Sequence, residues 1–221
     1  MIKDRIDFTT YANGERRSPL RHLAVGPAPM PAEPEGDWID LPPEFIDRLW
    51  AAAQFVGGRH PQLPLMQYVF LFDEHLYATN NECIVQIEAD LPGEARFLVE
   101  EVKALRGLAP TRTLFSHEFV AFAGDTGWCK FERIGPDTEA NMTLAETMKA
   151  MIGQHWCEAG DKVDLDVPPP TKEDKTFEIA GATFSRSNLR RVLALTKCVG
   201  FDSDPVVFGE GSTKGLMVSL N

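Results

Sequence analysis

Hydrophobic and polar positions along the chain follow two periods, one typical of helices and one typical of strands. Apolar residues recur at helical spacing in four segments, which predict helices at 43–55, 95–105, 142–156 and 185–197. Runs rich in aromatic and β-branched residues, separated by Gly, Pro, Asn and Asp, predict strands between and after these helices. The strands are expected at 67–72, 75–79, 84–89, 111–115, 118–123, 128–134, 176–184, 205–208 and 216–220. The pattern predicts an α+β fold with helices packed on antiparallel sheets.

Breaks in this pattern divide the chain into segments. Residues 1–37 are irregular and rich in proline, although 2–11 could add a strand. A first unit is expected over 38–135 and a second over 142–221, joined by a linker. Within the second unit, 161–175 carries a run of prolines and several acidic residues, so it is expected to be a loop.

A faint internal repeat links the two units. Phe97, Val102 and Leu105 are followed by a predicted strand pair, and so are Phe184, Leu189 and Val192. Duplicated modules would leave such a trace, but any α+β chain could also show it by chance.

Composition narrows the class of protein. The chain has 221 residues, 43% of them hydrophobic, which is enough for one large or two modest domains. No apolar run approaches the roughly 20 residues of a membrane helix, and the charged residues 1–19 do not resemble a signal peptide. We therefore expect a cytoplasmic protein. Its four cysteines form no CxxC pair and are expected to be free thiols.

Charge gives two opposing indications about nucleic acid. The formal net charge of −11 argues against a nucleic-acid binder unless the basic residues are segregated on one surface. Two predicted helices carry stripes of basic residues, and the second of these helices contains no acidic residue. The residues of these stripes are Arg96, Lys103, Arg106, Arg186, Arg190 and Lys197. A solvated helix face is the simpler explanation for either stripe alone, whereas two such stripes favour a shared basic surface.

Enzymatic readings have little support in the sequence. The five histidines are scattered, and none has the partner four residues away that a zinc-binding helix would offer. Asp161, Asp164 and Asp166 resemble a metal loop but lack the glycine and distant glutamate of an EF-hand. The glycine-rich stretch 209–215 fails the phosphate-loop order and precedes a strand, so it is expected to be a hairpin loop.

Three short stretches carry a resemblance to a known family. LPPEFIDRLW (41–50) leads into the first predicted helix, EARFLVEEVKAL (94–105) covers the second, and DEHLYAT (73–79) forms a hairpin that ends in Thr79-Asn80. This region resembles one module of a DNA sliding clamp, the ring that holds a replicative polymerase on its template. The second unit is similar only loosely, because one strand pair between its two helices is missing, so a reduced second module is expected.

The resemblance implies a function without catalysis and without a cofactor. Clamp rings close with six modules, so two modules per chain imply a phage-like homotrimer, either viral or from a prophage. The DNA-facing positions of the family are basic residues on module helices, which correspond here to Arg96, Lys103, Arg106, Arg186, Arg190 and Lys197. The implied partners are duplex DNA, contacted without sequence preference, and a DNA polymerase and clamp loader that bind through short peptides.

The first helix of each unit departs from the family pattern. The helix at 43–55 has Arg48 as its only cation, beside Glu44 and Asp47, and the helix at 142–156 has only Lys149. Two alternatives therefore stay open. One is an α+β binding or assembly protein with a clamp-like module that forms no ring, and the other is a small metal-dependent enzyme that uses the aspartates at 161–166.

Overall fold

The computed structural model describes residues 32–58, 64–132, 138–157, 160 and 162–220. The possible strand at 2–11 lies outside this part of the chain. The helices are α1 (Phe45–Ala53), α2 (Val99–Leu108), α3 (Thr138–His155) and α4 (Arg186–Leu195). The first eight strands are β1 (Ile39–Asp40), β2 (Tyr68–Phe72), β3 (His75–Thr79), β4 (Cys83–Glu88), β5 (Ala95–Leu98), β6 (Arg112–Phe115), β7 (Phe119–Gly124) and β8 (Gly127–Glu132). The last five are β9 (Thr176–Ile179), β10 (Ala182–Ser185), β11 (Val199–Gly200), β12 (Val206–Phe208) and β13 (Thr213–Met217). The α+β fold is confirmed.

The same order of elements occurs three times: one leading strand, one helix, then three strands. The repeats are β1-α1-β2-β3-β4, β5-α2-β6-β7-β8 and β10-α4-β11-β12-β13. Leading strands are exchanged between the first two repeats, because β1 pairs with β6 and β5 pairs with β2. The faint sequence repeat is thus seen in the structure, where Phe97 and Phe184 lie on leading strands and both are buried.

The described residues form three sheets, and two of them make up the body of the fold. One has the order β1-β6-β7-β8, and the other runs over seven strands in the order β11-β12-β13-β4-β3-β2-β5. The first and third repeats meet where β4 and β13 pair antiparallel, from Cys83 opposite Met217 to Ile87 opposite Thr213. The predicted final hairpin is therefore present, but its second strand is β13, which starts earlier than 216 and also pairs with β4.

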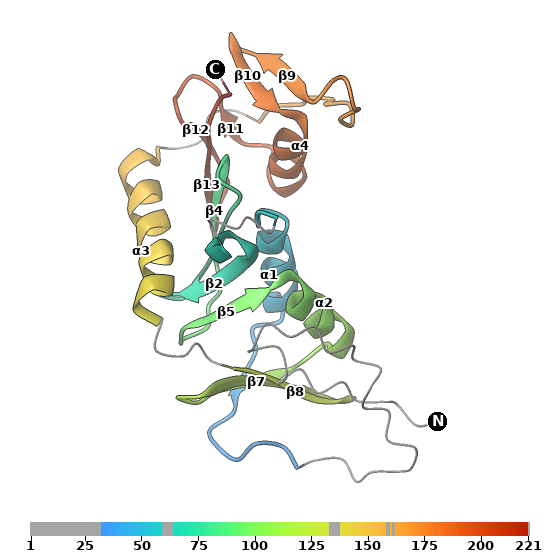
Figure 1. Ribbon diagram of the computed structural model, residues 1–221, viewed down its shortest axis with the longest axis vertical. Helices are drawn as coiled ribbons and strands as arrows, with labels where there is room; N and C mark the ends of the chain where they lie inside the picture. Colours follow the sequence, from blue (N-terminus) through green and yellow to red (C-terminus); the bar gives the residue numbers. More distant parts are fainter. Residues whose placement is uncertain (1–31, 59–63, 133–137, 158–159, 161, 221) are drawn as a thin grey trace.

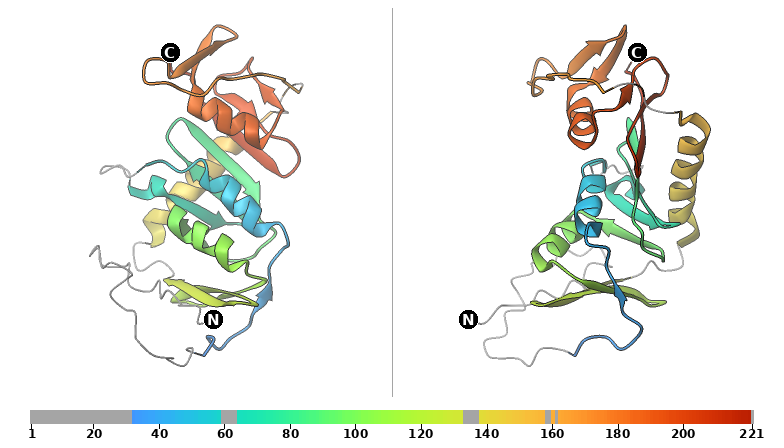
Figure 2. Two further views of the ribbon diagram at one scale, coloured as in Figure 1. Left: turned by 90° about the vertical axis from the view of Figure 1, so that its right-hand side faces the viewer. Right: turned by 180° about the vertical axis from the view of Figure 1, so that it is seen from behind.

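Helices cover both faces of the seven-stranded sheet. Side chains of α1, α2 and α4 share the main hydrophobic core with its strands, including Phe45, Val102 and Leu189. The helix α3 lies on the opposite face (Figures 1 and 2), where Met148 packs with Phe70. Since burial of apolar area stabilises by about 25 cal/mol per Å², both faces contribute to holding the β4–β13 junction together.

The apolar spacing of 142–156 predicts that Leu144, Met148, Met151 and Ile152 lie on one side of the helix, and this prediction is partly wrong. Met148 and Ile152 are buried against the sheet as expected. Met151, which was placed on the same face, is 39% exposed. The reason is geometric: a helix that packs on a flat sheet buries a narrow stripe, and positions one residue apart diverge by about 100°.

The predicted start of the helix at 95–105 is wrong. Residues 95–98 form the strand β5, and α2 begins only at Val99. Ala95 and Phe97 are buried while Arg96 and Leu98 are half-buried, an alternation that fits a strand. The edge of β2 decided between strand and helix, because pairing with it satisfies the backbone of β5.

The helix predicted at 185–197 is shorter than expected. Ser185 is its N-cap, and its hydroxyl accepts a hydrogen bond from the N–H of Asn188 at 3.5 Å. The helix ends at Leu195 because Thr196 adopts an extended conformation, with φ −148°. The next residue, Lys197, therefore lies beyond the helix, and its carbonyl accepts from the N–H of Val163 at 2.8 Å.

Candidate nucleic-acid interface

The candidate interface is the exposed surface of α1, α2 and α4 together with Lys197, which we call the helical face. On α2, Lys103 and Arg106 are exposed. The Arg106 guanidinium lies 4.7 Å from the ring centroid of Trp50 on α1, a cation–π contact that joins the two helices. Its charge is retained, because the ring attracts the guanidinium without neutralising it.

The helix α4 contributes two arginines to the helical face. Arg190 is exposed, and its guanidinium donates to the carbonyl of Val167 at 2.6 Å. Arg191 is also exposed and donates to Oδ1 of Asn188 at 3.1 Å. Both partners are uncharged, so both positive charges remain available to an anion. Arg191 was not among the predicted contact residues, although its place in a helix without acidic residues was a signal for it.

The positive charge of Arg186 is not available to an anion in the same way. Its guanidinium forms an ion pair with Asp174 and donates through Nε to the carbonyl of Thr176 at 2.6 Å. Its side chain is only 15% exposed. The arginine therefore holds α4 against the β9–β10 hairpin, and a carboxylate already balances its charge.

Arg96 lies on the other side of the sheet from the helical face. It stands opposite Phe70 in the β2–β5 ladder, and residues directly opposite share one face. Phe70 belongs to the cluster under α3, whereas Phe97 belongs to the core shared with α1 and α2. The guanidinium of Arg96 lies 4.6 Å from the ring centroid of Tyr68. The expectation that Arg96 and Lys103 form one helical stripe is therefore wrong.

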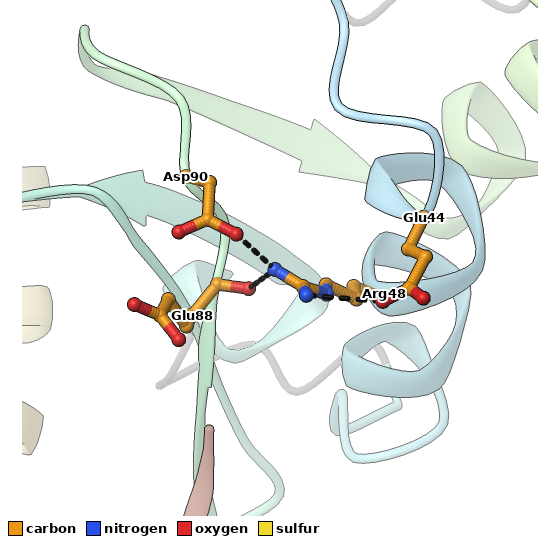
Figure 3. Close-up of polar contacts among 4 residues, drawn as sticks. All are labelled: Glu44, Arg48, Glu88 and Asp90. Carbon is orange, nitrogen blue, oxygen red and sulfur yellow. Dashed lines mark hydrogen bonds and ion pairs between the residues drawn. The ribbon is translucent and has the colours of Figure 1, made fainter. Parts of the chain in front are cut away.

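The only cation of α1 is engaged with acidic neighbours. Arg48 donates to Asp90 at 2.6 Å, to Glu44 at 3.0 Å and to the carbonyl of Glu88 at 3.0 Å (Figure 3). The hydrogen bond with Asp90 raises the pKa of the arginine. Arg48 thus ties α1 to the chain after β4 and adds no free charge to the helical face.

A polar network missed at the sequence level positions α4 on the first repeat. Asn188 is buried, and its Oδ1 accepts from Nδ2 of Asn80 at 2.8 Å. Its own Nδ2 donates to the carboxylate of Glu82. Asn80 caps the turn before β4, since its Oδ1 accepts from the N–H of Cys83 at 2.8 Å. Arg191 donates to the same Oδ1, so the network also holds its guanidinium beside Asn188.

A buried carboxyl stands at the start of α2. Glu101 accepts from the N–H of Leu98 at 2.8 Å, which satisfies one of the unpaired donors at a helix N-terminus. Burial raises the pKa of Glu101 to about 7, although this hydrogen bond and nearby Arg96 oppose the shift. The protonation of Glu101 is thus linked to the helix that carries Lys103.

The helical face as a whole is mixed in charge but locally basic. Exposed acids, Asp47 and Glu100, lie on α1 and α2. The exposed cations are Lys103, Arg106, Arg190, Arg191 and Lys197. Such side chains contact phosphates without reading bases. Within the described residues no group of three or more His, Cys, Asp or Glu side chains could hold a metal ion, and all four cysteines are free thiols.

Known proteins resemble this chain in structure but not in sequence. The sequence matches no family model and no curated protein. The DNA polymerase III beta subunit from Thermotoga maritima superposes with a TM-score of 0.58 at 13% identity, over 83% of this chain and 64% of that chain. The DNA polymerase sliding clamp from Bacillus subtilis superposes with a TM-score of 0.53 at 12% identity, over 87% of this chain and 66% of that chain. The Helicobacter pylori beta clamp bound to a DNA ligase peptide superposes with a TM-score of 0.52 at 9% identity, over 84% of this chain and 67% of that chain.

These likenesses show that the chain has the fold of bacterial DNA sliding clamps. The chain spans about two thirds of the length of each of these clamp chains. None of the helices among the described residues is long and apolar enough to cross a membrane.

Proposed function

We propose that this protein is a clamp-like processivity factor that binds duplex DNA without sequence preference and has no catalytic role. The observation that carries the proposal is the clamp fold combined with exposed cations on the surface of α1, α2 and α4. Lys and Arg suit a sliding surface because each phosphate contact is independent of sequence and exchanges readily with counterions.

The residues proposed to contact DNA differ in part from those expected from the sequence. Lys103, Arg106, Arg190 and Lys197 are retained, and Arg191 joins them because it is exposed on the same helix as Arg190. Arg96 and Arg186 leave the proposed set. The first lies on the opposite face of the sheet, and the second is paired with Asp174.

The proposed partners beyond DNA are a DNA polymerase and a clamp loader that bind through short peptides, in the cytoplasm. The Helicobacter pylori clamp was solved with a DNA ligase peptide, which supports peptide partners for a protein of this fold. A homotrimeric ring would follow if each chain held two full modules. The first two repeats exchange strands to form one full module, and the third repeat alone supplies half of another. Each chain therefore holds fewer than two full modules, so the number of copies in an assembly does not follow from the module count.

DNA binding can be tested by fluorescence anisotropy with a labelled duplex across a range of salt concentrations. Replacing Lys103, Arg106 and Arg190 by Ala should weaken binding equally for unrelated sequences. The slope of log K against log salt is negative, and each lost phosphate contact should reduce its magnitude by about 0.9. Arg96→Ala is the matched control, since it removes an arginine from the opposite face. Equal loss in the control, or no loss in the triple variant, would refute the assignment.

The second candidate function is a binding or assembly protein that uses the clamp fold without encircling DNA. The observation that favours it is the incomplete second module. Retention on circular and linear duplexes of equal length separates the two candidates. A closed ring stays on the circle after a salt challenge and slides off the linear duplex, whereas a binder that forms no ring treats both alike.

A further inference from the structure

The segment at 162–174, which we call the strap, runs along α4 in the direction opposite to the helix. Near its start, the N–H of Val163 donates to the carbonyl of Lys197 at 2.8 Å. Further along, the carbonyl of Val167 accepts from the guanidinium of Arg190 at 2.6 Å. The strap therefore lies beside two of the cations that we propose to contact DNA.

The end of the strap meets α4 at the start of the helix. There, Asp174 forms an ion pair with Arg186. The three cations that the sequence assigned to the basic stripe of this helix are thus all contacted by one segment. Arg191, which was not assigned to the stripe, donates to Asn188 instead. The strap is therefore specific to the side of α4 that carries the stripe.

An alternation of apolar and acidic residues holds the strap in place. Val163 and Leu165 are half-buried against the main hydrophobic core, and Val167 is buried within it. Between them, Asp164 and Asp166 are exposed. Neighbouring side chains of an extended segment point to opposite sides, which matches this pattern. The apolar residues thus anchor the strap, and the carboxylates face the solvent.

The two carboxylates stand where phosphates would approach α4. Asp166 directly precedes the residue that contacts Arg190, and Asp164 directly follows the residue that contacts Lys197. Neither carboxylate forms an ion pair with another described residue. Like charges repel over a Debye length, which is about 10 Å at 0.1 M salt. Both carboxylates therefore oppose a phosphate that approaches the same arginine or lysine.

We propose that the strap is autoinhibitory, and that Asp164 and Asp166 compete with the phosphates of DNA for the cations of α4. The proposal concerns regulation of the DNA-binding surface and rests on the proposed function. The effect is electrostatic. The strap supplies negative charge to a basic stripe that no DNA occupies, and it thereby lowers the affinity of the helix for polyanions.

The first test combines Asp164→Asn with Asp166→Asn and measures duplex binding by fluorescence anisotropy at low salt. Both side chains are exposed, and asparagine keeps their shape, so the fold should be retained; the midpoint of urea unfolding checks this. The Kd should fall by about fivefold, because one unit charge at about 4 Å in water contributes a factor of about this size.

The matched control combines Glu118→Gln with Glu146→Gln. These glutamates are exposed, on the β6–β7 turn and on α3, and the control changes the net charge by the same amount. A gain in affinity that is confined to the strap variant supports the proposal. An equal gain in the control would overturn it, because net charge alone would then explain the effect.

A third variant asks whether the carboxylates act through α4. In an Arg190→Ala background, the two asparagine substitutions should increase duplex affinity by less than they do in the unaltered chain. The reason is that no cation then draws a phosphate to this part of the strap. An undiminished gain would overturn the proposed competition, since the carboxylates would then repel DNA without regard to the arginine.

Inorganic polyphosphate separates this proposal from that of DNA binding, because it carries closely spaced phosphates without a double helix. The strap variant should bind it more tightly than the unaltered chain, as measured by isothermal titration calorimetry. A gain for polyphosphate, with no duplex binding by any variant, would support the strap and refute the DNA-binding function. Duplex binding that the substitutions leave unchanged would refute the strap alone. No gain with either probe would also overturn it.

Discussion

Glu101→Gln tests how the buried carboxyl at the start of α2 links stability to pH. In the folded protein burial raises the pKa of Glu101 from 4.5 to about 7. The unfolded chain exposes the carboxyl and restores its ordinary pKa. Between these two values the folded state binds a proton that the unfolded state has released. Stability from this group is therefore complete below pH 4.5 and falls as the pH rises to 7.

The size of the effect follows from the shift. One pKa unit corresponds to about 1.4 kcal/mol, so a shift of roughly two and a half units corresponds to about 3 kcal/mol at most. Glutamine has no proton to release, and its amide oxygen can still accept from the N–H of Leu98. The free energy of unfolding of Glu101→Gln should therefore lack this component. Relative to the unaltered protein, the variant should gain on the order of 3 kcal/mol between pH 4.5 and 8.

The assay is urea unfolding of both proteins, followed by tryptophan fluorescence at several pH values. The difference between the two free energies cancels every other titrating group, because those groups are common to both chains. A difference that stays constant from pH 4.5 to 8 would refute the reasoning. It would show that the carboxyl is solvated and that its hydrogen bond to Leu98 outweighs its burial.

Three further predictions concern packing and polar burial, each measured by urea unfolding. Ile152→Ala should lower the free energy of unfolding by about 2–4 kcal/mol, and Met151→Ala by less than about 0.5 kcal/mol, because only Ile152 packs on the sheet. Equal losses would contradict the orientation of α3. Tyr77→Phe should be neutral or stabilise by up to about 2 kcal/mol, because the buried hydroxyl has no hydrogen-bond partner among the described residues; a clear loss would reveal a partner. Asn188→Ala should cost about 1–3 kcal/mol, and a neutral result would mean that its network does not hold α4.

Local periodicity was sufficient for much of the fold. The runs of aromatic and β-branched residues at 67–72 and 75–79 predicted the β2–β3 hairpin, and the spacing of Phe45, Leu49 and Ala52 predicted α1. The secondary structure of these segments could be predicted because their local conformational preference and their burial in the tertiary structure agree. The secondary structure of residues 95–98 could not be predicted, because their apolar spacing fits both a helix and a strand. Pairing with the edge of β2 selected the strand.

The candidate interface was less predictable than the fold. Exposed cations on α2 and α4 follow from a helical pattern, and Lys103, Arg106 and Arg190 were found in this way. Arg186 was not separable from them, since its partner Asp174 lies in a loop whose path no local pattern specifies. The position of a residue on a helix indicates whether its side chain points away from the core. It does not indicate which acidic side chains lie beside it.

By itself, the sequence determined where most helices and strands form, that the fold is α+β, and which helices carry basic residues, because these properties depend on spacing within a few turns. Only the tertiary structure decided that α3 covers the face opposite α1, α2 and α4, that Arg96 belongs to that opposite side, and that β4 pairs with β13. Such relations depend on contacts between residues far apart in the chain. Their stability comes from burial and pairing across the whole fold, which no local pattern encodes.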